Sequence, residues 1–491
     1  MPRTQSAARP GSVSRALAAD RLGVPAVLFF VLASVAPLTV AAGVIPTAYS
    51  TTGLTGIPAG FIAIAIILAL FAVGYVAMTR HITNSGAFYA FISRGLGRVL
   101  GVTAALIALL AYSFLQVGLY GAFGPNAQTE AQTYLHVNWP WWIWALIAWA
   151  VVTVLGLLRV DVTGKVLGVL LTVEIIVILA ETVSGLVHPA GGQLSFATLS
   201  PSALTSGGFG TFGVLAVVAV LGFIGFEQAP VMAEEARNAR RTVPVATYVA
   251  LGMICVVYAG ASWSMAANAG RSHVVAAAGN LGPGLLFGLG SNGLSKAAQL
   301  LFLTSLFAAA LSFHNCVWRY IFALGREGVL PPALGRTGSN NIPKAASLTQ
   351  SATGLIAIVV YAIGGWPPMT DLFFWLGTTG GFGILILLAL TSVAVIVFFH
   401  RDHRGEDAWH RLIAPAMSVV LLTGIVVLAV MHYNVLLGVP PDSVASWLLP
   451  AMYAAIAVIG LLWGLLLRRT RPRVYATIGL GANAVTRRLT P

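Results

Sequence analysis

The segment that most constrains this fold is an apolar run, 212–220, that leads into two glycines, an acid and a charged stretch. Gly222 and Gly225 fall where a membrane-crossing helix would be at mid-depth, and Glu227 follows directly. A break at that depth exposes backbone amides and carbonyls that lipid cannot satisfy. It persists only where it lines a protected cavity, and transporters build substrate and ion sites in this way. The segment therefore predicts a membrane transport site.

The composition indicates a chain solvated mainly by lipid. Of its 491 residues, 58% are hydrophobic and only 8% are charged, whereas soluble domains carry about 25% charged residues. The net charge of +13 comes from residues at the ends of apolar runs, so we expect no nucleic-acid partner. Cys255 and Cys316 lie in apolar runs, and no Cys or His spacing fits a metal site. No cofactor is expected.

Apolar runs of about 20 residues predict membrane-spanning helices. Twelve such runs predict an all-α membrane protein that forms a single transmembrane domain over residues 1–491. The runs cover 24–50, 57–79, 97–123, 139–158, 164–187, 209–233, 244–267, 293–325, 344–364, 370–399, 412–432 and 448–467. The long loop 268–292 has room for a short helix on the outer side.

The basic residues predict the orientation. All Lys and Arg except Arg271 and Lys296 lie in the even-numbered loops, in the tails or at the adjoining helix ends. Cytoplasmic loops carry such an excess, so the tails 1–23 and 468–491 are predicted to be cytoplasmic in a plasma membrane protein. Arginine far outnumbers lysine, which favours a bacterial source with a GC-rich genome.

The first span carries a matching interruption. Pro37 lies about as far into the first run as Gly222 lies into the sixth. Proline lacks an amide hydrogen and clashes with the preceding helical turn. Because five spans separate the two starts, the two copies would have inverted topology, and paired interruptions point to a binding site at the midplane. Ordinary kinks stay an alternative, since Pro and Gly are common in membrane helices.

Three segments resemble the amino acid permeases of the amino acid–polyamine–organocation superfamily. The first is Phe223-Ile-Gly-Phe-Glu227 with Ala233-Glu-Glu-Ala-Arg-Asn238 and Arg241-Thr-Val-Pro244; the second is Asn84-Ser-Gly-Ala-Phe-Tyr89 with Gly95-Leu-Gly-Arg98; the third is Arg319-Tyr-Ile-Phe-Ala-Leu-Gly-Arg-Glu-Gly-Val-Leu-Pro331 with Ile342-Pro-Lys344. The resemblance covers about 20–467. It implies a five-plus-five inverted repeat, 24–187 and 209–399, with broken helices 1 and 6 and two extra helices in 412–467.

The chain departs from the family pattern at two places. The family often has a glycine-rich break in its first helix, where this chain has Ala36-Pro-Leu-Thr-Val-Ala41. Proton-coupled relatives often have a lysine midway along the fifth helix, where this chain has Glu174. The resemblance therefore implies the fold and the class of transport more firmly than it implies one substrate.

An α-amino acid fits the two breaks by its charges. Helix N-termini receive anions, so the second half-helices would take the carboxylate, while carbonyls near Ala36 and Gly222 would take the ammonium. The predicted substrate-binding residues are Ala36, Pro37, Leu38, Thr39, Gly222, Phe223, Gly225 and Phe226 from the breaks, with Tyr112 and Gln116 from the third span. Core packing for the phenylalanines, and interhelical hydrogen bonding for Tyr112, Gln116 and Tyr120, are open alternatives.

Glu174 and Glu227 are the predicted coupling or gating residues. Each lies inside an apolar span, where a lipid-exposed carboxylate would cost about 2.5–3.5 kcal/mol on insertion scales. Each must therefore face a cavity or a partner. A structural brace for the loose backbone of a break is the alternative to ion coupling at both positions.

These features predict a secondary active transporter that imports amino acids by alternating access. Neutral amino acids are favoured because the third span, and the tenth span beyond Asp371 at its start, offer no acid for a cationic side chain. A proton, or alternatively sodium, would supply the work, since no nucleotide-binding motif is present. Amine, polyamine or amino acid exchange on the same fold is an alternative, and a channel or membrane sensor is a weaker one. An enzyme is not expected, because His314 and Cys316 are two apart and cannot face each other on a helix.

Overall fold

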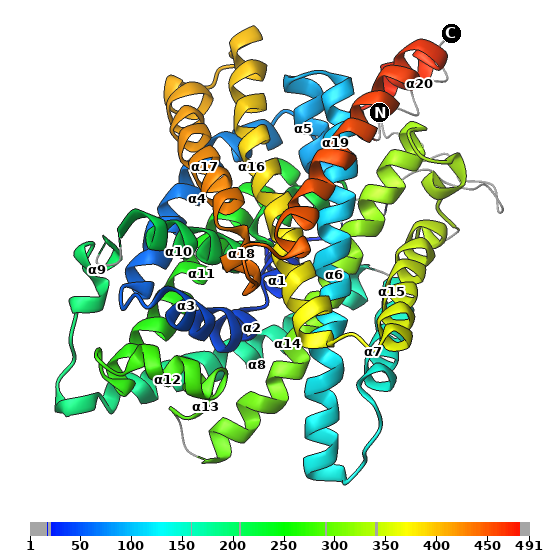
Figure 1. The fold of residues 1–491 in the computed structure, drawn as a ribbon. Helices are drawn as coiled ribbons and strands as arrows, with labels where there is room; N and C mark the ends of the chain where they lie inside the picture. Colours follow the sequence, from blue (N-terminus) through cyan, green and yellow to red (C-terminus); the bar gives the residue numbers. More distant parts are fainter. Residues whose placement is uncertain are drawn as a thin grey trace, which may run out of the picture.

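A computed structural model describes residues 17, 21–158, 160–205, 208–289, 292–338 and 342–481. Within these ranges the regular structure is helical, and the one β contact is an isolated bridge between Leu22 and Ala236. The helices form a bundle in which α6 (Arg98–Leu135) extends from one end to the other (Figure 1).

Eleven helical stretches of the described chain are long and apolar enough to cross a membrane, as a multi-pass membrane protein requires. They are Val24–Thr52, Ile57–Thr79, Arg98–Leu135, Gly164–Val187, Thr211–Met232, Ala239–Ala269, Gly293–Glu327, Lys344–Gly364, Pro368–Arg401, Trp409–Met431 and Val444–Thr470. Each overlaps one of the twelve predicted spans.

The remaining predicted span, 139–158, corresponds to the shorter helix α7 (Trp141–Gly156). Its 16 residues give a length of about 24 Å at 1.5 Å per residue, below the hydrocarbon thickness of about 30 Å. It packs against α6, α14 and α15. The twelfth crossing and the inverted repeat therefore stay predictions.

The first eight α-helices contain the first broken span (α1 to α3) and the five helices that follow it (α4 to α8). Their bounds are α1 (Val24–Val35), α2 (Pro37–Thr39), π-helix η1 (Val40–Val44), α3 (Ile45–Thr52), α4 (Ile57–Thr79), α5 (Ala87–Gly95), α6, α7 and α8 (Val160–Val187). The short helices η2 (Ala190–Gly192), η3 (Ala197–Leu199) and α9 (Ser202–Thr205) lie in the loop that leads to the sixth span.

The second part of the chain begins with the other broken span. Its elements are α10 (Gly208–Phe223), η4 (Phe226–Met232), α11 (Ala239–Ala269), α12 (Val274–Leu281), α13 (Gly284–Phe287), α14 (Asn292–Glu327), η5 (Pro332–Gly335), α15 (Lys344–Gly364), η6 (Pro368–Trp375), α16 (Leu376–Arg401), η7 (Trp409–Ile413), α17 (Ala414–Met431), α18 (Tyr433–Leu437), α19 (Val444–Thr470) and α20 (Pro472–Thr477). Helices α12 and α13 confirm the predicted short helix within 268–292.

The two broken spans lie at the centre of the bundle. The most apolar window of the sixth span is 94% buried, whereas that of α19 is 17% buried and faces outward. Helix α1 packs against α8, α11, α14 and η4, so the first break lies against the sixth and is enclosed by three long helices. Figure 1 shows α1 and α2 in the interior and α19 along the outside.

Candidate functional site at the two helix breaks

The first broken span changes direction at Ala36. Helix α1 ends at Val35, Ala36 has a left-handed backbone with φ 52°, and Pro37 begins α2. Proline suits the first position of a helix because the amide it lacks would have no partner there, but it cannot continue α1. The new helix start leaves early amides without intrahelical acceptors. At this break they belong to Leu38 and Thr39.

Side chains from two other helices satisfy these amides. Glu174 of α8 accepts the Leu38 amide on Oε1 at 2.6 Å, and the Ser305 hydroxyl of α14 accepts the Thr39 amide at 3.3 Å. The Ser305 hydroxyl also donates to the same Glu174 Oε1 at 2.5 Å. All four residues are buried. A carboxylate 136 residues away in the chain therefore closes the first break.

The sixth span is interrupted at Gly225. Helix α10 ends at Phe223, Gly225 has φ 119°, and the 3₁₀-helix η4 continues from Phe226. Glu227, which lies in η4, turns back to accept the Gly225 amide on Oε2 at 2.8 Å. Its Oε1 accepts the Tyr112 hydroxyl of α6 at 2.8 Å, and its backbone carbonyl accepts the Tyr75 hydroxyl at 2.8 Å. This break carries its own carboxylate, and both carboxylate oxygens are bonded.

The two breaks touch each other through Gly225. A Cβ atom at this position would lie 2.8 Å from the backbone nitrogen of Val35 and 2.9 Å from the carbonyl carbon of Ser34. A side chain cannot move backbone atoms aside cheaply, and the positive φ is one that L-residues with a side chain rarely adopt. Only glycine therefore allows the sixth span to approach the end of α1 this closely.

Hydroxyl groups lie against three carbonyls in the last two turns of α1. The Ser312 hydroxyl donates to the Phe30 carbonyl at 2.7 Å, Ser34 donates to the Val31 carbonyl at 2.8 Å, and Tyr258 lies 3.4 Å from the Val35 carbonyl. At the first break, protein side chains therefore hold the Leu38 and Thr39 amides, and the Tyr258 hydroxyl lies near the Val35 carbonyl that the end of α1 frees. An α-amino acid prefers the same two kinds of group, because its carboxylate seeks helix N-termini and its ammonium seeks carbonyls.

The comparison with known proteins agrees with this geometry. The amino acid permease family matches residues 26–473. This chain belongs to that family. It is also similar to the branched-chain amino acid permease BcaP of Lactococcus lactis subsp. cremoris (strain MG1363), with 25% identity over 374 residues that cover 72% of this chain and 76% of the relative. The family resemblance that the sequence indicated is confirmed, and amino acid transport is the activity it supports.

The predicted site residues fall into two groups in this permease. Ala36, Pro37, Leu38 and Thr39 form the first break, and Gly225 and Tyr112 belong to the second. Gly222 lies inside α10, three residues before the interruption, so the predicted break is displaced toward Gly225. Its position still packs close to the first break, since a Cβ there would lie 3.1 Å from a methyl group of Val40.

Gln116 lies in a separate hydrogen-bond chain. It donates to the Tyr120 hydroxyl at 2.8 Å and accepts from Gln350 of α15 at 2.8 Å. Tyr112 shares its helix face, yet Tyr112 points to Glu227 while Gln116 and Tyr120 link α6 to α15. The alternative of interhelical hydrogen bonding describes Gln116 and Tyr120 in this arrangement, and substrate binding by Gln116 stays a prediction.

Phe223 and Phe226 are both packed among aromatic rings. The Phe223 ring lies 6.1 Å from that of Phe61 and 5.8 Å from that of Tyr258, and the Phe226 ring lies 6.0 Å from that of Phe71. Both side chains are fully buried. They form an apolar wall beside the breaks. Ordinary core packing would produce such a wall, and so would a pocket for an apolar substrate side chain.

The three family-like segments meet at one end of the bundle. Arg326 at the end of α14 makes a two-pronged contact with Glu234, at 2.7 and 2.6 Å, and the Ser85 amide donates to the same carboxylate at 3.0 Å. Burial opposes ionisation of Glu234, but the Arg326 guanidinium and the Ser85 hydrogen bonds outweigh it and lower the pKa of this carboxyl. Arg319 pairs with Glu235 at 2.6 Å. These buried ion pairs tie the segment after η4 to α14.

Ser305, Tyr75 and Gln228 lie at the breaks but were not among the site residues predicted from the sequence. Ser305 and Ser312 are seven apart in a mostly apolar stretch, 300–313, so they share a face, and that spacing was the available signal. Gln228 is buried next to Glu227, and neither of its side-chain polar atoms has a hydrogen-bond partner within the described chain. A buried, unpartnered amide beside a helix break is a candidate ligand for a polar group of the substrate.

Proposed function

We propose that this permease is a secondary active transporter that imports neutral amino acids by alternating access and is driven by protons. The observation that carries the proposal is the pairing of two helix breaks, each with a buried glutamate on an amide that the break leaves free. Buried acids inside membrane spans mark ion and substrate paths in transporters. The path would be closed in this conformation, because the predicted site residues are buried.

The proposed architecture is a repeat of five helices, 24–187, followed by an inverted copy, 209–399, with α17 and α19 added. In this scheme α7 is the fourth crossing, and both tails are cytoplasmic in a bacterial plasma membrane. Support comes from the distribution of basic residues. Cysteine labelling tests the scheme in a variant that lacks the two native cysteines. Ser195→Cys should react with an impermeant reagent in intact cells, and His403→Cys only after permeabilisation; the reverse pattern would refute the orientation.

The proposed substrate has an apolar side chain. Phe223, Phe226 and Leu38 supply apolar surface next to the breaks, and Glu174 and Glu227 are each engaged by backbone amides rather than placed for a cationic side chain. The name of the lactococcal relative points to branched-chain amino acids for that protein. Leucine, isoleucine and valine are therefore the first substrates to test here.

Coupling would follow from competition for the Leu38 amide. While Glu174 is ionised it accepts this amide and the Ser305 hydroxyl on one oxygen. Binding a proton weakens that oxygen as an acceptor, because charge-assisted hydrogen bonds are roughly twice as strong as neutral ones. The amide can then turn to the α-carboxylate of the substrate. Proton and substrate would thus favour each other's binding, and this coupling is reciprocal.

Purified protein in liposomes tests the proposal. We expect leucine uptake to exceed its equilibrium level when the lumen is alkaline and to fall to that level when a protonophore is added. Replacing sodium by potassium on both sides should leave uptake unchanged. If uptake depends on sodium, the coupling ion is sodium and not the proton. Accumulation of amines instead of amino acids would favour the alternative of an amine or polyamine transporter. Transport seen only with substrate on both sides would show that the protein is an exchanger.

A further inference from the structure

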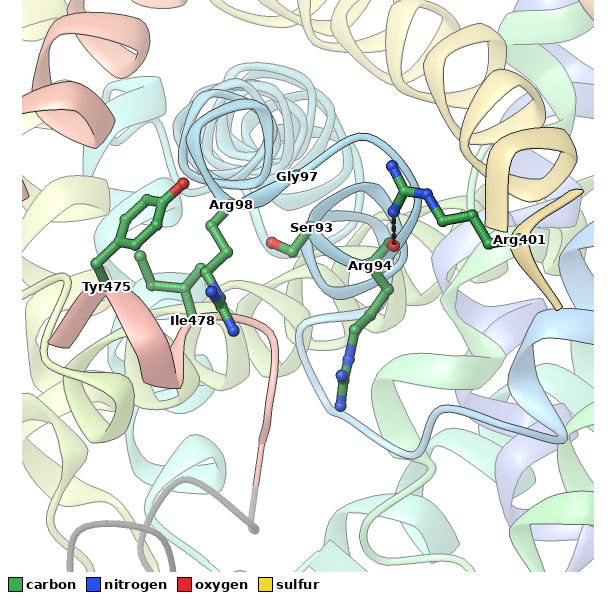
Figure 2. Close-up of a pocket in the computed structure, with 7 residues that line it drawn as sticks. All are labelled: Ser93, Arg94, Gly97, Arg98, Arg401, Tyr475 and Ile478. Atoms are coloured by element: carbon green, nitrogen blue, oxygen red, sulfur yellow. Dashed lines mark hydrogen bonds between the residues drawn. The ribbon is translucent and has the colours of Figure 1, made fainter. Parts of the chain in front are cut away.

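A hollow of about 300 Å³ lies at the same end of the bundle as the buried ion pairs. It is formed where α5, the start of α6, the end of α16 and the segment around α20 come together (Figure 2). Its walls are Ser93, Arg94, Gly97, Arg98, Arg401, Tyr475 and Ile478. It belongs to none of the contacts described at the helix breaks.

The charge in this hollow is of one sign. Three arginines line it, and none of its described lining residues is an acid. Arg98 is also the first residue of α6, whose first turn contains no acidic residue and whose N-cap, Gly97, offers no side-chain cap. Helix N-termini carry partial positive charge, so a cation at this end is unfavourable. Both features call for an anion.

The described contacts of the Arg401 and Arg98 guanidinium groups are with a carbonyl and an aromatic ring rather than with a carboxylate. Arg401 Nη1 lies 3.4 Å from the Arg94 carbonyl, and the Arg98 guanidinium lies 5.5 Å from the centre of the Tyr475 ring. Figure 2 shows Arg401 reaching from α16 toward the backbone of Arg94, and Arg98 extending between Arg94 and Ile478. Three parts of the chain that are distant in sequence build this one site.

Ser93 supplies an independent indication of a ligand. Its side chain is only 6% exposed, and within the described chain its Oγ has no hydrogen-bond partner. The hydroxyl lies against the first turn of α6, since a Cβ on Gly101 would overlap it. A buried polar atom without a partner costs free energy, so a ligand that accepts this hydrogen bond would be stabilised by a group already in place.

We propose that this hollow binds a phosphate group. A phosphate offers several acceptor oxygens at once, which suits guanidinium groups, a serine hydroxyl and the first amides of a helix together. It would also offset the repulsion between Arg98, Arg401 and the positive end of α6. The phosphate can come from the head group of an anionic phospholipid or from a dissolved anion, and both present the same oxygens.

The hollow lies beside the lipid-exposed surface. A Cβ on Gly464 of α19 would be 3.0 Å from Val99, the residue after Arg98, so the last turns of α19 lie level with the start of α6. Leu100, Leu465 and Leu466 are exposed at this level. Basic pockets beside membrane helices bind anionic head groups, so a lipid whose acyl chains follow these leucines would place its phosphate near Arg98.

The test uses the full-length protein in nanodiscs, with the thermal unfolding midpoint as the measurement. One arm replaces phosphatidylcholine by increasing fractions of phosphatidylglycerol. The other adds inorganic phosphate to phosphatidylcholine discs, with chloride at matched ionic strength as the reference. We expect at least one arm to raise the midpoint of the wild-type protein in a saturable manner. The arm that responds identifies the source of the phosphate.

Single substitutions assign the response to the hollow. Arg98→Gln and Arg401→Gln should each weaken the apparent affinity for phosphate about tenfold, because hydrogen bonds between charged groups are stronger than those between neutral groups. Ser93→Ala should weaken it by a smaller factor. Arg469→Gln removes an exposed arginine at the end of α19, outside the hollow, and should leave the affinity unchanged. A flat response in both arms, or an equal loss in Arg469→Gln, would overturn the proposal.

Discussion

The two helix breaks have the same defect and resolve it in different ways. At the sixth span Glu227 accepts an amide only two residues away, so the break and its cap form one local unit. At the first span the acceptor is Glu174, which comes from another helix. A local cap holds its own geometry, whereas a cap from another helix also ties two helices together.

The breaks also differ in how many carboxylate oxygens they use. Glu227 is bonded on both oxygens, to the Gly225 amide and the Tyr112 hydroxyl. Glu174 receives both of its bonds on Oε1. An amide side chain has one oxygen and one NH₂ group, so glutamine can reproduce the contacts of Glu174 but not those of Glu227. We therefore predict that Glu174 exchanges the coupling proton, while Glu227 mainly holds the break.

The largest effect is expected for Gly225→Leu, which would disrupt the close contact between the two breaks. The positive φ alone costs a residue with a side chain of order 1–3 kcal/mol, and its Cβ would overlap the backbone of Ser34 and Val35. We expect uptake and counterflow to fall below detection in liposomes, while membrane insertion is preserved.

Gly424→Leu is the matched control, because a Cβ at Gly424 of α17 meets no atom within 4 Å. It should transport at the wild-type rate. If Gly225→Leu retains near-normal uptake at normal expression, the close approach of the two breaks is not part of the transport site.

Glu227→Gln is expected to have the next largest effect. One donor, either the Gly225 amide or the Tyr112 hydroxyl, would face the NH₂ group of glutamine. Leaving a buried donor unsatisfied costs about 1–3 kcal/mol, which corresponds to about tenfold or more in an equilibrium. Uptake and counterflow should therefore fall together, and Tyr112→Phe should fall less. Loss of uptake with intact counterflow would instead make Glu227 the coupling residue.

Glu174→Gln should separate accumulation from exchange. Glutamine keeps an oxygen for the Leu38 amide and the Ser305 hydroxyl but cannot take up a proton, so counterflow should stay close to the wild-type rate while pH-driven accumulation is lost. Both assays are run on the same liposomes, with and without an imposed pH gradient. A Glu174→Gln protein that still concentrates substrate would show that Glu174 is structural and would make Glu227 the leading candidate for coupling.

The smallest effect is expected for Ser305→Ala. It removes the hydroxyl that donates to Glu174 and accepts the Thr39 amide, a change of about 1.5 kcal/mol or roughly tenfold in rate. Ser312→Ala, one heptad along the same face, is the control, because the Phe30 carbonyl it bonds also accepts from Ser34. Equal effects of the two substitutions would mean that α14 supports the first break only by packing.

Local signals in the sequence were sufficient for the class of fold. Length and hydrophobicity of a run decide whether a helix can cross lipid, so eleven predicted spans recur as helices of adequate length. The length of the short helix α7 was harder to predict, because the hydrophobicity of 139–158 does not show where a helix begins and ends. The breaks could also be foreseen, since Pro37 and Gly225 act through their own backbone chemistry.

What the sequence by itself determined was therefore the lipid environment, the family, and the approximate places where two helices must break. Only the tertiary structure decided that the first break is closed by Glu174 and Ser305, that Tyr112 serves the second break while Gln116 serves α15, and that Ser93 lies among three arginines. The physical reason is that a break is set by the torsions of a few adjacent residues. Its partners are set by which helices come within hydrogen-bond distance, and that depends on the packing of the whole bundle.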